Sequence, residues 1–140
     1  MKILNSELFD FNFGTTDGHP IADTILLLRS KKKSEWERLQ AVKNDPLLQK
    51  MPKEPQWIVR DRQYLAIEIG LIAMNNLTAP KTVLLAIRLL SEINNGSAMT
   101  RLSNLHERVK EDASIDERVK KALARAVKKF YLKKRREEVS

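Results

Sequence analysis

The residues of this chain with the clearest chemistry are basic, and they gather near its C-terminal end. Ten lysines and arginines and no acidic residue lie between Arg118 and Arg136. Such a density of cations attracts phosphates, and each neutralised phosphate releases counterions, which gives affinity for a polyanion regardless of its sequence. The segment therefore indicates binding to a nucleic-acid backbone or to another polyanion.

A helical wheel at about 100° per residue separates this segment into two arcs. The apolar arc consists of Ile115, Val119, Ala122, Leu123, Ala126 and Phe130. Most of the basic residues share the opposite arc, with Lys120 and Lys134 as exceptions. We predict an amphipathic helix over residues 115–137 whose basic face is about 27 Å long. The predicted nucleic-acid contacts are Arg118, Lys121, Arg125, Lys128, Lys129, Lys133, Arg135 and Arg136 of this helix, and Lys31, Lys32 and Lys33 of a second basic run.

The overall charge and the absence of cysteine narrow the classes of function. The 140 residues carry a net charge of +8, which favours polyanionic partners. Without cysteine the chain has no disulfide, no thiolate nucleophile and no cysteine-based zinc site. Its only histidines are His19 and His106, which argues against a histidine-rich metal site. We therefore expect neither a metal nor a cofactor.

The sequence also argues against a membrane partner. No apolar run approaches the roughly 18 residues that a spanning helix needs. The first residues do not have the basic-then-apolar pattern of a signal peptide. The apolar arc of the C-terminal helix has alanines where a membrane-surface helix carries bulky side chains. We expect a cytoplasmic protein.

Sparse glycine and proline and the lack of clear alternation predict an all-α protein. We expect one domain, residues 1–140, in which five or six helices form a compact bundle around a core helical hairpin at 57–94. The first arm of this hairpin is apolar nearly all round, which is typical of a buried helix. Thr78 and Pro80 suit the start of the second arm. Antiparallel register predicts that Glu68 and Arg88 pair across the hairpin.

Capping signals mark the ends of several other helices. Ser34 with Glu37 and Ser114 with Glu117 both have the spacing of a capping box, in which each residue satisfies a backbone donor of the other. The run 94–96, Asn-Asn-Gly, is a helix stop, because these residues tolerate the left-handed conformation.

The first 19 residues differ from the rest of the chain. Phe9, Phe11 and Phe13 alternate with Asp10 and Asn12, which is the two-residue period of an extended segment. A turn-forming run with two glycines follows it. We predict an extended N-terminal arm, residues 1–19, whose three phenylalanines bind a partner. The arm either docks on a neighbouring subunit or folds back over its own bundle.

One pair of residues suggests an enzyme. Arg101 and His106 have four residues between them, and this spacing resembles the arginine–histidine signature of HEPN ribonucleases, which are also small and helical. The resemblance implies that both side chains would act near a scissile phosphate. In this chain Leu102 follows the arginine where that family has a polar residue. On one regular helix the two side chains would diverge by about 140°, so we assign no catalytic residue.

The order of the last two helices also has the layout of a helix-turn-helix DNA reader. Lysines outnumber the asparagine, glutamine and serine side chains that contact base edges, which favours backbone binding over sequence reading.

The sequence therefore predicts a non-catalytic protein that binds the phosphate backbone of RNA or DNA. We expect it to be a small subunit of a larger nucleoprotein assembly, with other protein subunits as partners. In size, helicity and charge it resembles, in general character, the small helical subunits of CRISPR effector complexes, which line a nucleic-acid path without catalysis. The alternatives are an adaptor or inhibitor whose basic face meets an acidic protein, a helix-turn-helix regulator and a HEPN-like ribonuclease.

Overall fold

In the computed structural model the described residues, 20–139, form six α-helices and one short 3₁₀ helix, and contain no strand. The all-α prediction is confirmed. The predicted arm, residues 1–19 with Phe9, Phe11 and Phe13, lies outside the described residues. The elements in chain order are α1 (Pro20–Arg29), α2 (Glu35–Ala41), η2 (Pro46–Leu48), α3 (Gln56–Met74), α4 (Pro80–Ile93), α5 (Gly96–Val109) and α6 (Glu117–Val139).

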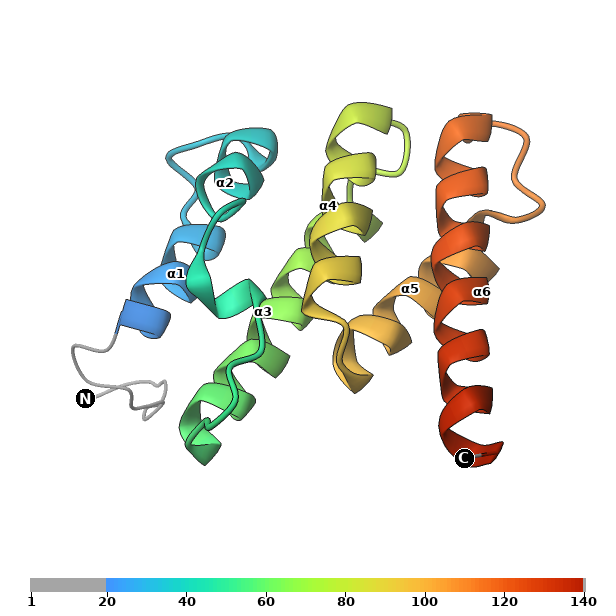
Figure 1. The fold of residues 1–140 in the computed structure, drawn as a ribbon. Coiled ribbons are helices and arrows are strands. Elements are labelled where there is room, and N and C mark those ends of the chain that lie inside the picture. The colour runs from blue at the N-terminus through green and yellow to red at the C-terminus, as the bar shows by residue number, and fades with distance from the viewer. Residues whose placement is uncertain (1–19, 140) are drawn as a thin grey trace, which may run out of the picture.

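The six α-helices form three pairs that lie side by side in two layers (Figure 1). Helices α1, α3 and α5 contact one another in that order, and α2, α4 and α6 do the same in the other layer. Each helix also contacts its partner in the pairs α1–α2, α3–α4 and α5–α6. The predicted core hairpin is the middle pair, so it is covered from both ends of the row.

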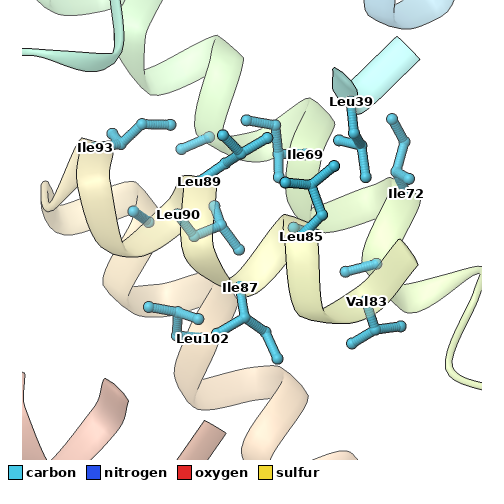
Figure 2. Packing of buried hydrophobic residues seen from close by; sticks show 14 of the residues in the cluster. Leu39, Ile69, Ile72, Val83, Leu85, Ile87, Leu89, Leu90, Ile93 and Leu102 are labelled. Atoms are coloured by element: carbon cyan, nitrogen blue, oxygen red, sulfur yellow. The ribbon is translucent and has the colours of Figure 1, made fainter. Parts of the chain in front are cut away.

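The core lies on both sides of α4. Figure 2 shows Leu85 and Leu89 of α4 pointing toward Ile69 of α3, whereas Ile87 lies toward Leu102 of α5. Eight of the fourteen residues of α4 are buried, and they spread over too wide an arc for contact with only one neighbour. The apolar residues at helical spacing on α4 and α5 are all buried, namely Val83, Ile87, Leu90, Ile93, Leu102, Leu105 and Val109.

Several helix ends follow the local signals. Ser34 and Glu37 form the predicted capping box, with the Glu37 N–H donating to the Ser34 hydroxyl at 3.2 Å. Pro80 is in the first turn of α4, as predicted, but the residue before the helix is Ala79, and no side chain caps this end. The expected Thr78 cap is therefore wrong. Pro80 lacks the N–H of the first helical position, which is one of those that a helix start leaves unpaired.

The junction between α4 and α5 is very short. Asn94 ends α4 in the left-handed conformation, with φ 50°, as the sequence predicted. Asn95 then caps α5 by accepting the Ala98 N–H at 2.8 Å. Because one asparagine ends a helix and the next begins another, α5 turns back against α4 without a linker.

The predicted pair of Glu68 and Arg88 is wrong. The Nε of Arg29 on α1 donates to Glu68 at 3.1 Å, and Arg88 pairs with Glu92 one turn along its own helix, at 3.4 Å. Arg88 lies opposite the buried arc of α4, so its side chain is 63% exposed. The acid on α3 instead faces α1, which contacts a different side of that helix from α4.

The expectation that α3 is buried all round is also wrong. Tyr64 is 45% and Leu71 50% exposed, and Trp57 and Met74 are exposed as well. Helices α1, α4 and α5 contact the other sides of α3, and no described helix covers this fourth side.

Arg62 holds the chain before α3 in place. Its side chain is 6% exposed, and its guanidinium donates to the carbonyls of Leu47, at 2.8 Å, and Gln49, at 3.1 Å, and to the carboxylate of Glu54. Glu54 also accepts the Met51 N–H at 2.8 Å. These hydrogen bonds, that from Arg62 first, lower the pKa of Glu54 from 4.5 to about 2.

We predict a pH window for this interaction. Because the folded pKa of Glu54 is depressed, its contribution to stability is present above pH 4.5 and is lost as the pH falls towards about 2. The Glu54→Gln variant should therefore lose less free energy of unfolding than the wild type across that interval, as measured by urea titrations at several pH values. Parallel pH profiles for the two proteins would contradict this assignment.

Gly70 allows α3 and α5 to approach closely. A Cβ added at this position would lie 2.7 Å from both Cγ and Cδ of Arg101, and 3.0 Å from its Cβ. The stem of Arg101 therefore crosses α3 in the space that a larger residue would occupy. Glycine costs helix propensity here, and the close approach is the physical reason for it.

We predict that Gly70→Ala lowers the melting temperature, although alanine favours a helix by about 1 kcal/mol over glycine. Overpacking against Arg101 should cost about 1–3 kcal/mol. In an Arg101→Ala background the same replacement should become stabilising, because the clash is gone. Thermal unfolding of the four proteins of this cycle is the measurement, and an equal effect of Gly70→Ala in both backgrounds would show that the two residues do not compete for space.

Candidate nucleic-acid interface

The start of α6 is set by Asp116. Its carboxylate accepts the Arg118 N–H at 2.7 Å and also pairs with the Arg118 guanidinium at 3.0 Å. The predicted capping box of Ser114 and Glu117 is wrong, because the Ser114 hydroxyl donates to Asp112 at 2.6 Å. The helix therefore begins at Glu117, two residues after the predicted start. The hydrogen bonds from Arg118 lower the pKa of Asp116, which keeps the cap charged.

The apolar arc of α6 packs on α4 and α5, as predicted. Val119 and Leu123 are fully buried, and Ile115 in the preceding turn is 4% exposed. Ala122 and Ala126 are partly buried against the same core. One face of α6 is thereby fixed, and the opposite face is left to solvent.

Six basic side chains are exposed on this opposite face, which we call the basic face of α6. The described part of the chain provides no ion-pair partner for any of them. Arg118 and Lys120, nearer the start of the helix, are paired with Asp116 and Glu117. The side chain of Lys133, another predicted contact, lies outside the described part of the structure. The basic face consists of Lys121, Arg125, Lys128, Lys129, Arg135 and Arg136.

The second predicted basic run is far along the row of helices. Lys31, Lys32 and Lys33 are exposed in the connection between α1 and α2. Figure 1 shows this connection at the opposite end of the molecule from α6. The structure therefore does not join the two predicted groups of basic residues into one surface.

A groove runs beside the basic face, between α6 and the junction of α4 and α5. Its volume is about 330 Å³, and Leu90, Met99 and Phe130 contribute to its lining. Lys129 and Arg136 also line it, so two cations of the basic face border the groove. Sequence reasoning missed this feature. The only local signal was the Asn94–Asn95 junction, which does not indicate where α6 packs.

Arg101 and His106, the pair that resembles a ribonuclease signature, lie on the same regular helix, α5. Arg101 directs its stem across Gly70 of α3, and its buried Nε has no hydrogen-bond partner. At about 100° per residue His106 projects about 140° away from it. Convergence of the two side chains on one phosphate is therefore not favoured by the helix geometry.

The described residues contain no group of three or more histidine, cysteine or acidic side chains placed to hold a metal ion. Within the same residues, no helix combines the length and the apolar character needed to cross a membrane. Comparisons with protein-family models, with curated proteins and with solved structures give no match to this chain.

We predict that Asp116→Ala lowers the melting temperature by several degrees, because α6 loses its N-cap. Ser114→Ala is the matched control. Its hydroxyl bonds to Asp112 and not to the helix, so this replacement should change the melting temperature much less. Equal losses in the two variants would place the cap at Ser114 after all.

Proposed function

We propose that this protein binds the phosphate backbone of a nucleic acid, without catalysis, through the basic face of α6. The observation that carries the proposal is the line of six exposed cations without acidic partners among the described residues. When such cations neutralise phosphates, the counterions condensed on the nucleic acid are released, and this release favours binding.

Several exposed cations elsewhere in the protein are neutralised by acidic neighbours. Arg88 pairs with Glu92, Arg108 with Asp112, and Lys110 with Glu107, all at one-turn spacing. Such pairs are typical of a solvated helix surface. The basic face of α6 differs from this pattern, because its six cations have no acidic partners among the described residues. A polyanion explains the difference better than solubility does.

The composition of α6 favours contact with the backbone over reading of bases. Between Glu117 and Val139 the helix contains no asparagine, glutamine, serine or threonine. The first two are the side chains that pair with adenine edges. Lysines and arginines spaced along one face suit successive phosphates instead, and phosphate contacts position a protein without specifying a sequence.

The basic face is short. From Lys121 to Arg136 it extends about 22 Å, which matches roughly six phosphates along one strand of a duplex. A contact of this length gives modest affinity for one copy. This supports a role as one small subunit of a larger nucleoprotein assembly, in which other subunits extend the path.

The test compares two triple variants that remove the same charge from opposite ends of the molecule. Lys121→Gln, Arg125→Gln and Lys128→Gln together should weaken binding to single- and double-stranded RNA and DNA. They should also reduce the slope of log K against log salt by about 0.7–0.9 for each lost phosphate contact. Lys31→Gln, Lys32→Gln and Lys33→Gln together should have a smaller effect on both.

Binding is measured by filter binding at salt concentrations from about 50 to about 200 mM, because the affinity of a protein that binds the backbone changes greatly over this range. Equal losses in the two triple variants would mean that net charge alone governs binding. No measurable binding of the wild type to any nucleic acid would overturn the proposal and favour an acidic protein as the partner of this face.

A further inference from the structure

The central helix α3 exposes a line of large apolar side chains. Trp57 is 36%, Tyr64 45%, Leu71 50% and Met74 37% exposed. The first three are seven residues apart, so they follow one side of the helix over about 21 Å. Ile67, between Tyr64 and Leu71, is half-buried on the same side. Exposed apolar surface of this extent on a central helix marks a contact site.

Arginines border this line on both sides. On the α1 side, Arg29 pairs with Glu68, which lies one turn from Tyr64 and from Leu71 on the surface of α3. On the α5 side, Arg101 crosses Gly70 and has no ion-pair partner in the described part of the chain. We call the apolar line with its two borders the α3 face. It suits an apolar segment that carries negative charge.

We propose that the α3 face binds the N-terminal segment of the same chain, with Phe9, Phe11 and Phe13 against α3. These residues alternate with Asp10 and Asn12. In an extended segment that alternation directs the three rings to one side and the two polar residues to the other. The segment thus has one side for the apolar line and one for water.

The direction of α1 makes binding within one chain feasible. Arg29, at the end of α1, pairs with Glu68 in the second half of α3. Nearer the start of α1, the Thr24 hydroxyl donates to Asp45, which directly precedes η2. The Leu47 carbonyl of η2 accepts a hydrogen bond from Arg62 in the first half of α3. The start of α1 therefore lies toward the start of α3. Figure 1 agrees, because both helices begin low in the view and rise together. The chain before Pro20 consequently joins α1 at the end of the α3 face that carries Trp57.

The length and the charge of the segment also fit. The seven residues from Phe13 to Pro20 span at most about 25 Å, and four further residues to Phe9 add up to about 14 Å. The rings can therefore be distributed from Trp57 towards Leu71. Residues 1–19 contain three acids and one lysine. Glu7 is on the same side of the extended segment as the phenylalanines and would lie toward Arg101 at the far end of the face.

The absence of cysteine permits a direct test by disulfide formation. Phe9→Cys with Leu71→Cys places the only two thiols of the protein on the segment and on the α3 face. The matched control is Phe9→Cys with Leu132→Cys, because Leu132 on α6 is 46% exposed. Under mild oxidation of dilute protein, the first pair should form an intrachain disulfide roughly ten-fold faster than the control, since docking raises the effective concentration of the two thiols.

Equal rates for the two pairs would overturn the proposal. A disulfide that joins two chains would also overturn it, because the segment would then lie on another copy. Non-reducing gels separate these results, and circular dichroism of the reduced proteins checks that both variants keep their helices.

Fluorescence of Trp57 gives a second test that needs no new thiols. Trp36→Phe leaves Trp57 as the only tryptophan and keeps an aromatic ring beneath the Lys81 ammonium, which lies 4.6 Å from the ring centre. In this background, Phe9→Ser, Phe11→Ser and Phe13→Ser together should shift the emission to longer wavelength and increase quenching by acrylamide. Unchanged emission and quenching would overturn the proposal. Neither test involves the basic face of α6, so the proposed function can fail while this inference stands.

Discussion

The burial of α4 between its neighbours is the constraint on which the rest of the structure depends. Its apolar side chains point to α3 on one side and to α5 on the other, and α2 and α6 contact it within its own layer. Helix α3 likewise contacts α1 and α5, so the middle pair joins both ends of the row. Because a packed interior tolerates little change of volume, the position of α4 fixes the spacing of the three helix pairs.

Polar interactions then secure the connections between the helices. Arg62 is nearly buried, but its guanidinium donates to two backbone carbonyls and to the Glu54 carboxylate, so its burial is compensated. It fastens the chain between η2 and α3. The helix ends are secured by local interactions. Asn94 ends α4 in the left-handed conformation, and Asn95 accepts a backbone N–H of α5. Asp116 accepts a backbone N–H of α6. These few residues determine the direction in which each helix leaves its neighbour.

The two outer surfaces of the molecule differ in chemistry as a result of this arrangement. Helix α6 is the last in its layer, so one side of it packs and the other carries unneutralised positive charge. Helix α3 is central, yet large apolar side chains are exposed on its outward side. One end of the molecule therefore has a basic surface, whereas the middle pair has exposed apolar side chains. The basic face suits a polyanion, and the apolar face suits a protein segment.

The sequence alone determined the features that depend on neighbours within one turn. The apolar stripes of α4 and α5, the capping box at Ser34, the left-handed stop at Asn94 and the two arcs of α6 are local consequences of side-chain size and hydrogen bonding, and each is present in the structure. The tertiary structure alone decided which partner each long side chain takes. Glu68 pairs with Arg29 and not with Arg88, because the faces of α3 and α4 that meet are apolar. It also decided that one side of α3 stays open, that a groove forms beside α6, and that Lys31–Lys33 lie away from the basic face. An apolar pattern indicates that a surface favours burial, but the packing of helices that are distant in sequence determines which element buries it.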